Sequence, residues 1–217
     1  MTETVKQTMA ALEKNNIKTF YAETVADVLP IVKTLIKKGD VIACGGSTSV
    51  KEAGIMELIE NGDYKFYDRN KPGLTNEERE NIFAITLNAD AYFCSSNAIT
   101  KKGELVNVDG FCNRVSSIAF GPKNVIMVVS TNKIVDDISA AVLRVKTVAA
   151  PKNCVRLGKN TYCAKMGECV SIGQGLGTEM TAGCDSNERI CRTYVISGKQ
   201  GIKDRIKVIF CGEPLGY

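Results

Sequence analysis

The stretch with the clearest chemical potential is VIACGGSTSVKEAGIMELIE, residues 41–60. Its apolar start predicts a buried strand, and its second half has the spacing of an amphipathic helix. Glycines let a backbone approach a ligand closely, and the first turn of a helix offers free N–H groups to an anion. A tight turn in which a hydroxyl only caps the helix is the alternative. The residues expected to bind a phosphate or carboxylate here are Gly45, Gly46, Ser47, Thr48 and Ser49.

A second polar cluster lies in SSNAITKKGELVNVDGFCNR, residues 95–114. Arg114 could hold a carboxylate or phosphate through two parallel hydrogen bonds. A surface arginine paired with Asp109 is the ordinary alternative, and the Asn-x-Asp-Gly pattern is also a common turn. The residues of this cluster that we expect to face the anion are Asn97, Thr100, Asn107, Gly110, Asn113 and Arg114.

Proton transfer cannot use an imidazole, because the chain contains no histidine. Glu52 and Asp109 are therefore the candidate proton donors and acceptors. Glu52 stands just over one helical turn after Ser47, where it could face the ligand or lie in solvent. Lys133 follows the strand-like NVIMVVS and is a further candidate for binding the anion, with a solvent-facing lysine as the alternative. Cys44 has no histidine base beside it, which favours a small apolar role over that of a nucleophile.

The chain contains nine cysteines, an odd number, and no secretory signal is visible at its start. A disulfide framework is therefore not expected, whereas thiols or metal ligands are. Four late cysteines follow the pattern C-x5-C-x14-C-x6-C, and four thiolates can hold zinc or an iron–sulfur cluster. The spacing matches no standard motif, so reduced thiols in an irregular lobe are the alternative. The candidate metal ligands are Cys163, Cys169, Cys184 and Cys191.

The elements that must position these residues alternate along the chain. Apolar or β-branched strands are expected at 17–22, 41–44, 64–68, 91–96, 104–110, 124–130 and 205–216, with helices at 3–15, 24–40, 50–61, 75–90, 111–122 and 134–151. This order predicts a Rossmann-like α/β fold, with a mostly parallel sheet covered by helices on both faces. We expect one domain, 1–217, in which residues 152–217 form an irregular, cysteine-rich C-terminal part.

Composition excludes several classes of function. The net charge of +4 is small and no stretch is dominated by lysine and arginine, so nucleic acid is not an expected partner. No apolar run is long enough to span a membrane, and we expect a cytoplasmic protein. The glycine spacing matches neither a Walker loop nor a dinucleotide fingerprint, so no nucleotide cofactor is predicted. Association into a homo-oligomer stays open.

Three segments together resemble the LUD-domain family of lactate-utilisation proteins: GGSTSVKEAGI, NAITKKGELVNVDGFCNRVSSIAFGPKNVIMVVSTNKIV and AAPKNCVRLG. The resemblance covers roughly residues 1–217. It implies a fold similar to those of ribose-5-phosphate isomerase, glucosamine-phosphate deaminase and the CoA-transferases, with the ligand cleft beside the glycine turn. The family pattern falls on Gly45, Gly46, Ser47, Ser49 and Glu52, and on segments 97–100, 107–110 and 113–114. Cys44 and Cys112 stand where Gly or another small residue is expected.

Two functions follow from these observations. The resemblance implies participation in the oxidation of lactate or a similar 2-hydroxy acid, alongside an iron–sulfur partner. In that case the glycine turn and Arg114 would hold a small anionic metabolite. The alternative is a non-enzymatic metabolite-binding or scaffold protein, in which the late cysteines hold a structural metal ion. The fold is compatible with both, because fold does not fix function.

Overall fold

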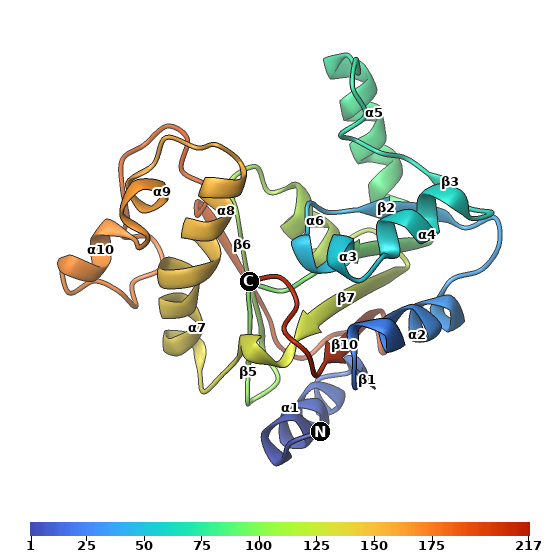
Figure 1. The fold of residues 1–217 in the computed structure, drawn as a ribbon, viewed down its shortest axis with the longest axis horizontal. Helices are drawn as coiled ribbons and strands as arrows, with labels where there is room; N and C mark the ends of the chain where they lie inside the picture. Colours follow the sequence, from blue (N-terminus) through green and yellow to red (C-terminus); the bar gives the residue numbers. More distant parts are fainter.

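A six-stranded parallel sheet forms the centre of the computed structural model, which describes residues 1–217 (Figure 1). Every strand pair in this sheet is parallel, as the near-continuous apolar strands predict. The order across the sheet is β1 (Lys18–Ala22), β10 (Ile206–Cys211), β7 (Asn124–Ser130), β4 (Ala91–Cys94), β2 (Val41–Cys44) and β3 (Lys65–Phe66). The expected α/β class is confirmed.

Helices cover both faces of this sheet because both faces are apolar. One face packs against α2 (Val28–Leu35), α3 (Thr48–Glu52) and α4 (Ile55–Asn61) through a core that includes Val32, Ile59 and Phe93. The opposite face packs against α1 (Glu3–Lys14) and α6 (Asn113–Ala119), through a core that includes Leu12 and Ile118. The capping box predicted at Thr75 is present at the start of α5 (Asn76–Leu87). None of the helices is both long and apolar enough to cross a membrane.

A second, smaller sheet lies against the first and was only partly expected. Its order is β8 (Ile134–Val135), β5 (Ala98–Thr100), β6 (Leu105–Asp109) and β9 (Thr193–Ser197), with both parallel and antiparallel pairs. Ile99 and Leu105 of this sheet join the core beneath α1. Strands β5 and β9 are absent from the sequence prediction, because segments of three and five residues with mixed polarity carry little periodic signal. Strand β8 falls on the start of the helix predicted at 134–151, and that start was wrong because the helix begins only at Ile138.

The helix predicted at 50–61 is broken, because Gly54 takes a left-handed conformation with φ of 72° between α3 and α4. The helix predicted to end before Pro151 instead continues. It runs through α7 (Ile138–Arg144), a π-helical turn (Val145–Ala149) and α8 (Ala150–Arg156). Proline lacks the N–H that an interior helical position needs, but Pro151 stands in the first turn of α8, just after the π turn.

The C-terminal part begins within α8 and contains six of the nine cysteines. It includes α9 (Tyr162–Met166), α10 (Val170–Gly173) and a loop that leads into β9. Figure 1 shows this part beyond α7 and α8, on the side away from β2 and β3. Strand β10 then returns the chain to the centre of the main sheet, between β1 and β7.

Candidate functional site

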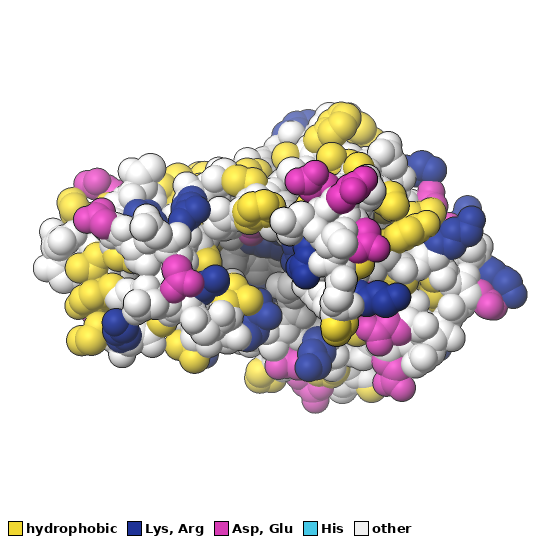
Figure 2. All heavy atoms as spheres, turned by 90° about the horizontal axis from the view of Figure 1, so that it is seen from above, with side chains coloured by type: hydrophobic (Ala, Val, Ile, Leu, Met, Phe, Trp, Pro, Cys, Tyr) yellow, Lys and Arg dark blue, Asp and Glu magenta, His cyan; other side chains and the backbone are white.

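A cavity of about 500 Å³ opens between the carboxyl ends of the main strands and helix α8. Figure 2 shows it as a hollow with lysine and arginine side chains around it. Only five of its 26 lining residues are hydrophobic. A ligand in an open parallel sheet is expected at this end of the strands, because the loops that follow the strands converge there.

The cavity brings together most of the residues that the sequence singled out. The glycine turn follows β2, the Asn97 loop follows β4, and Lys133 follows β7, so three neighbouring strands deliver them to one place. The expected residues that line it are Gly46, Ser47, Thr48, Ser49, Asn97, Asp109, Gly110, Asn113, Arg114 and Lys133. Ser47 caps α3 by accepting a hydrogen bond from the Val50 N–H, as the capping alternative has it, and it also lines the cavity.

Two of the expected residues have structural contacts outside the cavity lining. A Cβ at Gly45 would lie 2.7 Å from the Tyr92 hydroxyl oxygen, so packing requires glycine here. Glu52 accepts a hydrogen bond from the backbone N–H of Gly216 at 2.7 Å. That contact holds the C-terminal tail and does not place the Glu52 carboxylate in the cavity.

Thr100 and Asn107 also lie outside the lining, and both are completely buried. The Thr100 hydroxyl donates to the Glu104 carboxylate at 2.7 Å in the turn between β5 and β6. The side-chain oxygen of Asn107 accepts from Arg114 at 2.6 Å. Each of these two side chains therefore supports the loop that carries the lining residues.

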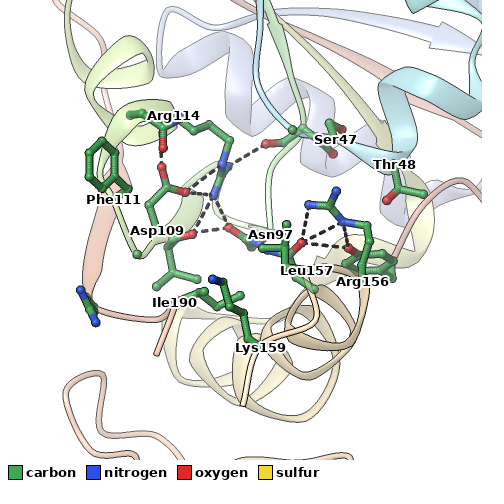
Figure 3. Close-up of a pocket in the computed structure, with 18 of the residues that line it drawn as sticks. Ser47, Thr48, Asn97, Asp109, Phe111, Arg114, Arg156, Leu157, Lys159 and Ile190 are labelled. Atoms are coloured by element: carbon green, nitrogen blue, oxygen red, sulfur yellow. Dashed lines mark hydrogen bonds and ion pairs between the residues drawn. The ribbon is translucent and has the colours of Figure 1, made fainter. Parts of the chain in front are cut away.

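Arg114 is bound by the protein on all sides (Figure 3). Its five guanidinium N–H groups donate to Asp109, to the side-chain oxygens of Asn97 and Asn107, and to two backbone carbonyls, at 2.6–3.0 Å. Asp109 also accepts the backbone N–H groups of Arg114 and Val115, both at 2.9 Å, at the start of α6. The ion pair with Asp109, which was the ordinary alternative, is present. Arg114 orders the loop, and none of its N–H groups remains free to bind a ligand.

Lys133 is the second buried cation of the site, with only 2 % of its surface exposed. Its ammonium donates to the hydroxyl oxygens of Ser49 at 3.0 Å and Ser95 at 3.2 Å. Burial is the main cause that lowers the pKa of Lys133 to about 7, and the positive charges of Arg144 and Arg114 lower it further. A pKa near 7 allows this lysine to gain or lose a proton at neutral pH. The alternative of a lysine that faces solvent is wrong, because the side chain is buried.

Five cationic lining residues were not named as candidates from the sequence, although one of them, Arg156, stands in the segment AAPKNCVRLG: Arg69, Arg156, Lys159, Arg189 and Arg192. Arg69 follows β3 at the same edge of the sheet, a position that the strand prediction could have flagged. A Cβ at Gly46 would lie 3.4 Å from Arg69 Nη2 and 3.7 Å from Arg156 Nη2, so both guanidinium groups reach the glycine turn. The buried Nε of Arg69 has no hydrogen-bond partner.

The charge of the lining is strongly unbalanced. Seven lysine and arginine side chains face the cavity against two carboxylates, Asp109 and Glu188. Those two are already paired, with Arg114 at 2.9 Å and Lys159 at 3.4 Å. The other five cations have no carboxylate partner within ion-pair distance. Low-dielectric walls concentrate such a field, so the cavity favours anions.

The four late cysteines lie around one small cavity of about 10 Å³, together with a fifth, Cys154. Cys154 Sγ lies 3.7 Å from Cys163 Sγ. The hydrogen bond between the two thiols lowers the pKa of Cys163 and raises the pKa of Cys154. No three Cys, Asp or Glu side chains are already arranged to hold a metal ion. The empty space between the five thiols is about that of one water-sized atom.

The two other cysteines near the site are not arranged as nucleophiles. Desolvation is the main cause that raises the pKa of the Cys44 thiol to about 12, which agrees with the apolar role favoured from the sequence. Cys112 has a left-handed backbone with φ of 63°, which explains why glycine was expected there.

A parallel α/β sheet with a cationic cavity beyond the carboxyl ends of its strands thus defines the class of this protein. The chain belongs to the LUD-domain family, whose model matches residues 5–211. Its fold is similar to the crystal structure of a DUF162 family protein from Deinococcus radiodurans, with a TM-score of 0.52 and 17 % identity over 97 % of both chains. At that identity the likeness shows the fold alone. No curated protein matches the sequence.

Proposed function

We propose that this protein binds a small anionic metabolite in the cationic cavity and takes part in the oxidation of lactate or a similar 2-hydroxy acid. Membership of the LUD-domain family supports the association with lactate utilisation. The observation that carries the proposal is that five of the seven lysine and arginine side chains around the cavity have no carboxylate partner. Such a charge distribution stabilises a bound anion and repels cationic metabolites.

Arg69 and Arg156 are the residues that we expect to contact the anion first. Both reach the glycine turn, where Thr48 and the backbone of Gly46 line the cavity. Arg156 is held in place by Asn153 and by the Tyr217 hydroxyl, at 2.7–3.0 Å. The buried, unpartnered Nε of Arg69 gains a hydrogen bond if an anion accepts it, which removes a desolvation cost. Arg114 then acts by holding the wall in shape.

Lys133 is the residue that we expect to move a proton. Oxidation of a 2-hydroxy acid to a 2-oxo acid releases two electrons and two protons, one of them from the hydroxyl group. A lysine with a pKa of about 7 is neutral in part of the population at neutral pH and can accept that proton through Ser49 or Ser95. The C2–H bond also breaks, and we propose that its proton goes to solvent while the two electrons go to a separate iron–sulfur protein, the partner that the family resemblance implies.

The volume of the cavity favours a second candidate. About 500 Å³ lies within the 300–1,000 Å³ typical of sites for drug-sized ligands, so a three-carbon acid alone would leave most of it filled with water. Non-enzymatic binding of a larger, multiply charged metabolite is therefore the alternative, and the number of unpaired cations agrees with it.

Thermal unfolding with added L-lactate, pyruvate and inorganic phosphate tests the proposal. A ligand at about 100 times its Kd adds roughly 2.7 kcal/mol and should raise the Tm by about 5–11 °C. Loss of a charged hydrogen bond in Arg156→Ala should weaken binding by about 10–100-fold. Arg79→Ala, on exposed α5, is the control and should bind normally.

Turnover with an artificial electron acceptor then separates the two candidates. Lactate-dependent reduction of the acceptor supports the oxidation, whereas phosphate-dependent stabilisation without turnover supports the second candidate. If none of the three anions raises the Tm, the cavity is not an anion site and both candidates fail.

A further inference from the structure

A buried cluster of cysteines lies apart from the carboxyl ends of the main strands. Cys154 of α8, Cys163 of α9, Cys169 before α10 and Cys191 before β9 are all at most 8 % exposed. Cys184 reaches the same small cavity but is half-buried. Four chain segments thus line one small cavity with thiols, although no three of them are yet arranged around a single ion.

The cluster contains two cations that have no carboxylate partner. Lys146, in the π-helical turn, is 1 % exposed and donates to the Ser171 hydroxyl and to backbone carbonyls only. Arg189 donates to the sulfur of Cys191 at 3.1 Å. Neither forms an ion pair with Asp or Glu. A buried charge is costly unless an opposite charge lies beside it, so negative thiolates are the natural partners here.

We propose that this cluster is a structural zinc site whose ligands are the four most buried thiolates, from Cys154, Cys163, Cys169 and Cys191. Four thiolates carry four negative charges, Zn²⁺ carries two positive charges, and Lys146 and Arg189 carry one each. The buried group is then electrically neutral. This set replaces Cys184, which the sequence spacing suggested, with Cys154.

The geometry of one thiol pair agrees with this assignment. Zn–S bonds of about 2.3 Å in a tetrahedron separate neighbouring sulfurs by roughly 3.8 Å. The two sulfurs of Cys154 and Cys163 are 3.7 Å apart. The sulfurs of Cys169 and Cys191 instead accept hydrogen bonds from Ser171 and Arg189, and both line the shared cavity. The cavity of about 10 Å³ has room for a single ion.

Metal and acid-labile sulfide analysis of the anaerobically purified full chain, after reconstitution with zinc alone, tests the proposal. We expect one zinc and no sulfide per chain. Cys154→Ser should lower the zinc affinity by more than about 100-fold, beyond the 10–100-fold loss typical of removing an outer-sphere partner. Cys184→Ser and the remote control Cys44→Ser should retain zinc.

Cobalt substitution keeps the test valid if Cys154→Ser does not fold. The charge-transfer band of the Co²⁺ form counts thiolate ligands, and it should report four thiolates in both wild type and Cys184→Ser. A loss of zinc in Cys184→Ser with retention in Cys154→Ser would overturn the ligand set. Iron with sulfide, or a wild-type chain that binds no zinc, would overturn the single-ion site.

Discussion

The replacement Arg114→Ala separates two roles for the most highly bonded side chain of the cavity. The guanidinium is only 12 % exposed and its partner Asp109 only 10 %, and it donates five hydrogen bonds to protein acceptors. Removal of one partner from a buried ion pair costs about 3–5 kcal/mol, because the other charge stays buried. For a chain of this size that corresponds to a fall in Tm of roughly 6–20 °C.

The assay compares Arg114→Ala with Arg156→Ala by urea unfolding and by anion titration. Arg156 is exposed and bonds only Asn153 and Tyr217, so its loss should cost under about 1 kcal/mol of stability while it weakens anion binding. Arg114→Ala should instead cause a large loss in the free energy of unfolding and only a small change in anion affinity. Arg114→Lys should recover little, because an ammonium cannot reproduce the planar fork of donors.

The reasoning fails if Arg114→Ala unfolds within about 1 kcal/mol of wild type and yet loses anion binding. Such a result would mean that the guanidinium leaves its loop contacts and binds the anion directly. If Arg114→Ala loses much of its stability but the folded fraction binds the anion normally, Arg114 acts by holding its loop in shape.

Two further predictions concern charge and capping. Lys133 releases its proton near pH 7 in the folded protein but keeps it to about 10.5 when unfolded. The unfolded state binds more protons between these values, so the free energy of unfolding should rise with pH there. Lys133→Met should remove this slope, as urea unfolding at several pH values would show, and an unchanged slope would exclude Lys133 as its origin. Thr75→Ala removes the hydroxyl that accepts the Glu78 N–H at 3.2 Å and should cost about 1 kcal/mol. A Tm within 0.5 °C of wild type, against about 2–4 °C expected, would contradict that contribution.

Features with local causes could be predicted from the sequence. The glycine turn after 41–44 was recognisable because the strand, the glycines and the helix pattern are contiguous. The capping box at Thr75 was recognisable because both partners lie three residues apart. The parallel sheet followed from strands that are apolar on both faces.

Features that depend on tertiary packing could not be predicted in this way. Arg69 and Arg156 are 87 residues apart in the chain, and only the tertiary fold brings both guanidinium groups to Gly46. The sequence suggested that Arg114 binds the anion because it shows an arginine with free donors. It does not show the protein acceptors that take up all of those donors in the folded chain. Those acceptors come from β6 and from the loop between β4 and β5.

Cys154 shows the same limit on the cysteine-rich side. It precedes the late group by nine residues and stands in a segment predicted to be irregular, so spacing gave no reason to include it. The continuation of the helix through Pro151 as α8 turns Cys154 toward Cys163. The helix end was wrong, and its correction is the reason that the proposed ligand set includes Cys154.

The two sites share a wall, and this links the stability of the lobe to the shape of the cavity. Arg189 and Ile190 line both the large cationic cavity and the small cysteine cavity. Their segment belongs to the loop between α10 and β9, which also bonds Asn160 through Ser186 and Glu188. A metal ion bound by Cys191 would fix this loop on one side, and so hold Arg189 and Arg192 at the rim of the cavity on the other. In that arrangement zinc has no part in the chemistry, yet it sets the positions of two of the cations that face the anion.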